Sequence, residues 1–152
     1  MATITKNTAV WDKIKANLLK SIPELNTGFF KESVYGPENS NLPVAQVARD
    51  NEEGTVNNPT RPFIRVGFGG ALEKGKLDKN ISNAVVSIVG GESPEQALKI
   101  LGPVFVSQMR QAIIDWDTPR NSDKTEAAKG KNDPLRDTDT MLNSVDFKVG
   151  TV

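Results

Sequence analysis

The chain has 152 residues, of which 37% are hydrophobic and 25% are charged, and its 19 Lys and Arg residues balance 19 Asp and Glu residues. It contains neither histidine nor cysteine, which excludes disulfides, thiolate metal sites and a histidine general base. A free-standing DNA-binding domain usually carries a basic surplus, and this chain has none.

The length favours a single structural domain over residues 1–152. No apolar run approaches the roughly 18 residues that a membrane-spanning helix needs. The first residues also lack the apolar region of a signal peptide. We therefore expect a protein that is made in a cytoplasm and makes no membrane contact.

Hydrophobic periodicity and turn residues predict mostly helices. In chain order we expect a helix over 9–21, a strand within 28–35, a short helix over 43–50, a strand or docked extended piece over 63–68, a helix over 71–89, a long helix over 93–116, one turn of helix over 138–143 and a strand over 144–152. The apolar stripe of the 71–89 helix comprises Leu77, Ile81, Ala84, Val85 and Ile88. Trp11, Met109 and Trp116 are expected in the core.

The helix over 93–116 has the clearest local signals. Ser93 is the expected N-cap, Pro94 the first helical residue, and Gln96 completes a capping box. Gly102-Pro103 should interrupt the helix, because proline lacks an amide hydrogen and clashes with the preceding turn. We therefore expect a kink or two abutting helices.

Residues 117–139 are too polar to build a core and are punctuated by proline and glycine, which predicts a long patterned loop or arm. Lys124, Lys129, Lys131 and Arg136 alternate with acidic residues, and no aromatic residue lies among them. Base stacking on single strands is therefore not indicated. Mixed charges suit ion pairs with a neighbouring subunit, and a passing DNA backbone is the weaker alternative.

Two patterns that could carry chemistry have simpler explanations. Residues 70–76 fit the spacing G-x-x-x-x-G-K of a phosphate-binding loop, but Leu77 replaces the magnesium-binding hydroxyl and Glu73 would face the phosphates. A helix start loosened by glycine explains them better. The carboxylates of Asp50, Glu52 and Glu53 could bind a hard cation or act on glycosides, but a solvated helix end accounts for them. We expect no enzyme, cofactor or metal.

Two blocks of sequence, separated by residues 66–115, carry a resemblance. The first runs through Val44-Ala45-Gln46-Val47-Ala48, Asn51-Glu52-Glu53-Gly54-Thr55 and Pro59-Thr60-Arg61-Pro62-Phe63-Ile64-Arg65. The second comprises Trp116, Pro119, Asn121, Thr125, Lys129-Gly130, Asp133-Pro134-Leu135, Asp137-Thr138, Met141 and Ser144-Val145. Together they resemble the two blocks of the tail-completion, or neck, proteins of tailed double-stranded-DNA bacteriophages. Glu53 replaces a frequent aromatic residue of that family, and Asp139 replaces its usual glycine.

The resemblance implies an α+β virion protein with a small mixed or antiparallel sheet, two to four flanking helices and a long extended C-terminal loop or arm. It implies a homo-oligomeric ring, commonly sixfold, at the head-proximal end of the tail. This ring would complete the tail and join it to the head, with DNA passing through its lumen. Its partners would be its own copies and the neighbouring neck, connector and tail proteins, with transient non-specific contact to genomic DNA. We expect it in the virion, and in the host cytoplasm during assembly.

Candidate assembly contacts lie in both blocks. They are Arg61, Phe63, Trp116, Lys129, Pro134, Leu135, Arg136 and Asp137. Phe63 is either a core plug or an interface anchor. We expect 119–137 to be an arm that becomes ordered when partner surfaces are present. Two alternatives stay open, namely a head–tail connector or tail-terminator ring at another level of the neck, and a small nucleotide- or DNA-binding module.

Overall fold

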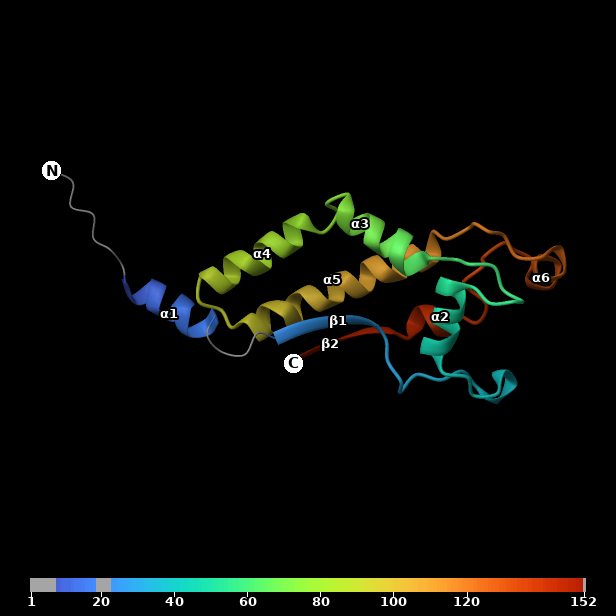
Figure 1. Cartoon of the computed structure of the whole chain (residues 1–152), viewed down its shortest axis with the longest axis horizontal. Helices are drawn as coiled ribbons and strands as arrows, with labels where there is room; N and C mark the ends of the chain where they lie inside the picture. The colour runs from blue at the N-terminus through green and yellow to red at the C-terminus, as the bar shows by residue number, and fades with distance from the viewer. Residues whose placement is uncertain (1–7, 19–22, 152) are drawn as a thin grey trace.

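The computed structural model of the chain describes residues 8–18 and 23–151 (Figure 1). Its elements in chain order are α1 (Thr8–Leu18), β1 (Pro23–Phe29), the 3-10 helix η1 (Pro37–Asn39), α2 (Val44–Glu53), the π-helix η2 (Phe63–Phe68), α3 (Gly69–Glu73), α4 (Asp78–Val89), α5 (Pro94–Ile114), α6 (Asp123–Lys129), α7 (Thr140–Asn143) and β2 (Val145–Thr151). The α+β class is confirmed, since helices accompany a two-stranded antiparallel sheet in the described part of the chain.

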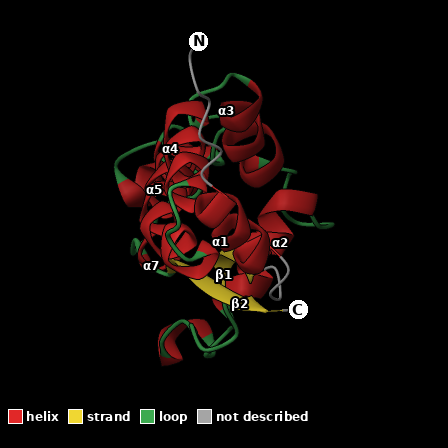
Figure 2. Ribbon diagram, turned by 90° about the vertical axis from the view of Figure 1, so that its left-hand side faces the viewer, coloured by secondary structure: helices red, strands yellow, loops and turns green. Residues whose placement is uncertain are grey.

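The sheet pairs β1 with β2, the earliest strand described with the latest. Their antiparallel register runs from Pro23 opposite Thr151 to Phe29 opposite Val145. α5 packs against both strands, and α4 packs against α5 (Figure 1). Figure 2 shows the strands on one side of α5 and α4 on the other. The result is an elongated molecule with α1 at one end and α2 with α6 at the other (Figure 1).

α5 begins as its sequence predicts and then runs through Gly102-Pro103 as one helix. The hydroxyl of Ser93 accepts a hydrogen bond from the amide of Gln96 at 3.1 Å. Pro103 lies inside α5 on an exposed side, so the expectation of two abutting helices is wrong. Gly102 is buried against the ring of Phe147 on β2. The Gly-Pro pair therefore brings the helix close to the sheet.

The main core lies where the C-terminal half of α5 meets α2, η2, α7 and β2. Its buried members are Val44, Ala48, Phe63, Val106, Met109, Ile113, Leu135, Met141 and Val145. Phe63 is fully buried, and Phe29 meets its ring edge-to-face with 6.1 Å between the centroids. Phe63 is therefore a core plug within the subunit, which is the first of the two roles that the sequence left open.

The expectation of an extended segment over 63–68 is wrong. These residues form the π-helix η2. The carboxylate of Glu52 accepts hydrogen bonds from the amides of Ile64 at 2.8 Å and Arg65 at 3.0 Å. Satisfying two free amides of the first turn in this way favours a helical start.

The remaining elements differ in smaller ways from the sequence prediction. The strand expected within 28–35 is wrong over most of its length, since β1 shares only Gly28 and Phe29 with it. The chain turns after Phe29, with the amide of Ser33 bonded to the carbonyl of Phe30. The helix expected over 71–89 is divided into α3 and α4 at Gly75, which has a φ of 69°. The helices near 43–50 and 138–143 and the strand near 144–152 are confirmed as α2, α7 and β2.

Two expected core positions on helices are exposed. Trp11 on α1 is 64% exposed, so its placement in the core is wrong, whereas Met109 is buried and Trp116 packs partly buried against the core. Within the predicted stripe of α4, Val85 is more than half exposed.

Residues 19–21 of the expected first helix lie outside the described residues. No described helix is both long and apolar enough to cross a bilayer.

Candidate functional site

The two sequence blocks meet at the end of the molecule that carries α2 and α6, and Arg61 joins them. Arg61 is only 7% exposed. Its Nε donates to the carbonyl of Pro119 at 3.1 Å, and its Nη2 donates to the carbonyl of Arg120 at 3.4 Å. Its Nη1 donates to Oδ1 of Asn51 at 3.3 Å. Arg61 therefore ties α2, the connector before η2 and the start of the 117–139 segment into one unit.

The electrostatics of Arg61 agree with an internal role. Burial lowers the pKa of its guanidinium, because the charged form loses hydration. The three oxygen acceptors replace part of that hydration, and the flat fork of donors suits them. A residue proposed as an assembly contact is thus used within its own subunit.

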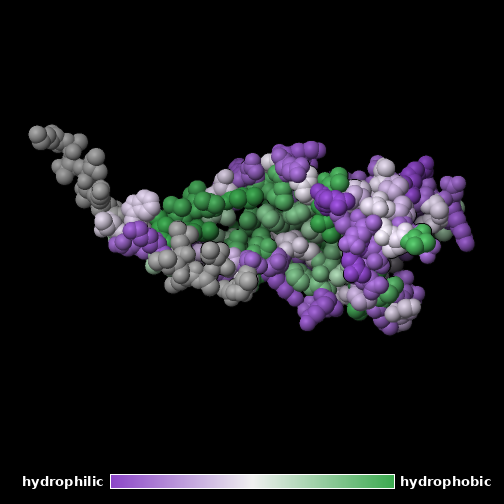
Figure 3. Space-filling model, in the orientation of Figure 1, coloured by the Kyte–Doolittle hydropathy of each residue, from purple (hydrophilic) through white to green (hydrophobic). Residues whose placement is uncertain are grey.

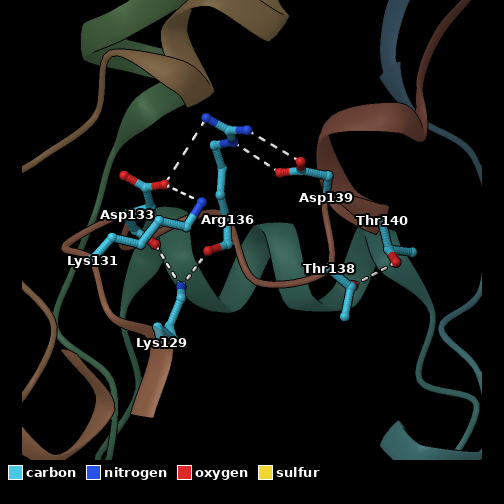
Figure 4. Close-up of polar contacts among 7 residues, drawn as sticks. All are labelled: Lys129, Lys131, Asp133, Arg136, Thr138, Asp139 and Thr140. Carbon is cyan, nitrogen blue, oxygen red and sulfur yellow. Dashed lines mark hydrogen bonds and ion pairs between the residues drawn. The ribbon is translucent and has the colours of Figure 1, made fainter. Parts of the chain in front are cut away.

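The 117–139 segment is held together by its own polar contacts, which Figure 4 shows in part. Nζ of Lys129 donates to the carbonyls of Asp133, at 2.7 Å, and Arg136. Nε and Nη2 of Arg136 donate to the carboxylate of Asp139 at 2.8 and 3.1 Å. Lys131 pairs with Asp133 at 2.6 Å. These contacts close the loop on itself.

The same ion pairs shift the pKa values of the carboxyls in this loop. The hydrogen bond from Arg136 lowers the pKa of Asp139, and that from Lys131 lowers the pKa of Asp133. In return, the hydrogen bond to Asp139 raises the pKa of Arg136. The loop is therefore held by charges that persist throughout the neutral range.

Local sequence also shapes this segment, which includes a helix that the sequence prediction lacked. The hydroxyl of Ser122 caps α6 by accepting from the amide of Thr125 at 3.3 Å, and Gly130 ends α6 in the left-handed region. Leu135 is buried in the main core. The segment is too polar to build a core of its own, but Leu135 anchors it in the main core.

Asp139 has a φ of 57° and a ψ of 10°, in the left-handed region that favours glycine. The carboxylate of Asp139 also accepts hydrogen bonds from Arg136, which a glycine could not do. The left-handed turn at Asp139 is therefore combined with an ion pair inside the 117–139 segment.

The other candidate residues lie at this same end. Phe63 and Leu135 are buried, while Trp116, Lys129, Pro134 and Arg136 are partly buried. Asp137 is exposed. Sequence reasoning thus singled out residues that build this end of the molecule, and Asp137 among them also faces outward.

A groove of about 350 Å³, here called the acidic groove, lies beside these residues. It is bounded by the 35–42 turn, α2 and the 134–141 stretch. Its lining residues are Tyr35, Asn39, Leu42, Val47, Asp50, Asn51, Asn58, Pro134, Leu135, Asp137, Thr138, Asp139, Thr140 and Met141. Neither lysine nor arginine is among these described residues. Burial raises the pKa of the Tyr35 hydroxyl, and the charge of Asp137 adds to the rise.

Sequence reasoning did not identify the acidic groove. One wall, the 35–42 turn, lies outside both blocks and is shaped by hydrogen bonds within residues 33–44. The amide of Tyr35 donates to the carbonyl of Leu42 at 2.9 Å, and the amide of Val44 donates to the carbonyl of Ser33 at 3.0 Å. Gly36-Pro37 marked a turn, but no local pattern shows which side chains the turn would meet.

A second surface feature is apolar. Figure 3 shows hydrophobic residues gathered over α4 and the first half of α5. The side chains of Val85, Val86 and Val89 on α4 and of Ile100 on α5 are each more than half exposed. The three valines lie on one side of α4, whereas Ile100 lines the groove between α4 and α5. We call the exposed apolar surface that these four residues give the two helices the α4–α5 apolar face. Its sequence signal was that Val86 and Val89 lie outside the expected apolar stripe, so α4 is apolar on more than one side.

The patterns that could carry chemistry do not form sites. Residues 63–68, directly before the G-x-x-x-x-G-K spacing, are a π-helix and not the strand that a phosphate-binding loop requires. Of the acidic cluster, Glu52 caps η2 and Asp50 lines the acidic groove. No metal-binding group of three or more acidic side chains is present in the described residues.

Comparison with protein-family models, with curated proteins and with solved structures finds no match to this chain.

Proposed function

We propose that this chain is a structural virion protein of the phage neck or tail. Its copies form a ring at the head-proximal end of the tail, which completes the tail and joins it to the head while DNA passes through the lumen. The identity of the partners comes from the resemblance of the two blocks. One structural observation carries the assembly itself, namely the α4–α5 apolar face.

The α4–α5 apolar face is the kind of surface that association covers. Contiguous apolar patches larger than a few hundred Å² are rare on soluble monomers and usually mark contact sites. Fully burying one such side chain contributes about 1.5–3 kcal/mol. Val85, Val86, Val89 and Ile100 are already partly covered, so a neighbour would gain about half of that from each.

The arrangement of surfaces fits a ring. The apolar face lies over α4 and α5, and the end of the molecule that carries α2, α6 and Arg61 lies away from it (Figures 1 and 3). When one surface of a copy meets a different surface of the next, the contact repeats by rotation and can close into a ring. The 117–139 segment, held by its own hydrogen bonds and ion pairs, would form the surface that the neighbouring neck and tail proteins bind.

Assembly can be tested by measuring solution mass by light scattering over a range of concentrations. The wild-type chain should form a ring-sized species, and Val86→Glu should lower its mass because a charge would be buried in the contact. Val56→Glu is the matched control. Val56 is 103% exposed in the loop after α2, so the same charge there should leave assembly unchanged.

The role in the neck is tested in the phage genome that encodes the chain. Disrupting the gene should yield filled heads and unattached tails by electron microscopy, and supplying the wild-type chain should restore whole virions. Whole virions formed without the chain would refute the proposal. A connector or tail-terminator ring would differ in which purified partner, the portal side or the tail-tube side, retains the protein.

A further inference from the structure

We infer that α1 of one copy binds the acidic groove of the next copy, with Trp11 entering the groove and Lys15 pairing with its carboxylates. The inference rests on the proposed assembly and names one of its contacts. It is carried by complementary surfaces at opposite ends of a single chain.

The acidic groove has an apolar floor and a charged rim. Val47, Leu135 and Met141 line it beside the carboxylates of Asp50 and Asp137. Within the described residues, neither of these two carboxylates has a hydrogen-bond or ion-pair partner, whereas Asp139 is paired with Arg136. A volume of about 350 Å³ is at the low end for ligand sites, which span roughly 300–1,000 Å³. The groove therefore suits one large apolar side chain with a cation beside it.

α1 presents that combination. Trp11 is 64% exposed, and Lys15 is exposed as well. Residues four apart lie on the same side of a helix, so the indole and the ammonium group point the same way. Ile14, by contrast, is almost fully buried. Trp11 therefore has an exposed aromatic surface that its own subunit does not cover.

The groove of the same chain is out of reach of its own α1. Lys13 lies beside Gly91, just before α5, and the groove lies near the other end of α5 (Figure 1). The 21 residues of α5 span about 31 Å at 1.5 Å per residue. The occupant is therefore α1 of a second copy.

Charge complementarity favours this occupant. Lys13 and Lys15 exceed Asp12 on α1, while the lining of the groove carries carboxylates without a basic residue. Opposite charges on the two surfaces orient the approaching copies and raise the association rate. Since the two surfaces differ, the contact runs head to tail, as a closed ring requires.

The first test uses Trp11 as its own reporter. The chain has two tryptophans, and Trp116→Phe leaves only Trp11. Nε1 of Trp116 has no hydrogen-bond partner, so this change removes no hydrogen bond. As concentration rises, the fluorescence of Trp11 should shift to shorter wavelength and become protected from a soluble quencher. Added salt should weaken the effect because it screens the charges.

The second test exchanges the charges and is done in the same Trp116→Phe background. Lys15→Glu alone, and Asp50→Lys with Asp137→Lys in another chain, should each weaken association by about tenfold or more. Mixing the two variants should restore it, because each altered surface then meets an opposite charge. The matched control replaces two exposed carboxylates elsewhere, Glu24→Lys with Glu73→Lys, and should leave association unchanged.

The outcomes separate this inference from the proposed function. If copies assemble by light scattering while Trp11 stays solvent-exposed, the inference is overturned and the ring proposal stands. Failure of the mixed variants to associate also overturns it, and so does a monomer at every concentration. If Val86→Glu prevents ring formation but Trp11 still becomes protected, the contact exists independently of the apolar face.

Discussion

Gly102 offers a sharp test of how α5 packs on the sheet, because the expected sign of a substitution there is opposite to the usual one. Replacing glycine with alanine inside a helix normally stabilises a protein by about 0.5–1 kcal/mol. At Gly102, a Cβ would lie 2.2 Å from Cδ2 and 2.4 Å from Cε2 of Phe147. These separations are far shorter than van der Waals contact.

Overpacking of this kind costs about 1–3 kcal/mol, because a side chain or the backbone must move. Subtracting the gain in helix propensity, we expect Gly102→Ala to lower the free energy of unfolding by about 1–2 kcal/mol. The free energy can be measured by urea denaturation followed by circular dichroism, provided that the slope of the transition is unchanged. Gly70→Ala is the matched control, since a Cβ on this helical glycine meets nothing within 4 Å. It should stabilise the chain.

Removing the ring should reverse the sign. In a Phe147→Ala background, Gly102→Ala should raise the free energy of unfolding by about 0.5–1 kcal/mol, because only the helix propensity remains. If Gly102→Ala stabilises the wild-type chain as much as Gly70→Ala does, the close contact between α5 and β2 is not formed and the reasoning is refuted.

Three further predictions concern the end that carries α2 and α6. Arg61→Met should lower the free energy of unfolding by about 2–3 kcal/mol, since it leaves three partly buried oxygens without donors, and should speed hydrogen exchange over residues 117–139. Unchanged exchange there would show that Arg61 does not hold the segment. Asp139→Ala should be about 1 kcal/mol less stable than Asp139→Gly, because both lose the bond to Arg136 and alanine alone is strained at positive φ; equal denaturation midpoints would contradict this. Because Arg136 lowers the pKa of Asp139 below its ordinary value of 3.8, the pair stabilises the fold above that pH and the contribution is lost as pH falls through the lowered pKa. Asp139→Asn should therefore lose less stability on acidification, by under about 1 kcal/mol, and a loss equal to that of the wild-type chain would rule the pair out as a source.

The elements that could be predicted from the sequence are those whose causes are local. The capping box at Ser93 lies within four residues, and so the start of α5 was readable. The π-helix η2 was not, because its cap is the carboxylate of Glu52, which the chain brings in from the preceding helix. Apolar periodicity predicted the stripe of α4, but it does not show whether another element covers each residue, and Val85 in that stripe is exposed.

The candidate site shows the same division. Residues of the two blocks, among them Arg61 and Leu135, meet at one end of the molecule, where they make contacts within the subunit. Their roles depend on partners far along the chain, since Arg61 bonds to a carbonyl 58 residues away. The acidic groove depends on the 35–42 turn, where Gly36-Pro37 predicts a turn but not the side chains that it meets. Composition excluded histidine and thiolate chemistry. It could not show that an exposed tryptophan lies at one end of the molecule and an acidic groove at the other.

The pairing of β1 with β2 bears on how and when the subunit is made. Apart from α1, every described helix lies between these two strands in the sequence. The core cannot close until the ribosome has synthesised β2, because Val145 is buried in it and Phe147 packs against α5. A product of premature termination would leave the sheet-facing side of α5 bare, and such surfaces are targets of chaperones and proteases. The topology thus makes folding of the core depend on synthesis through β2.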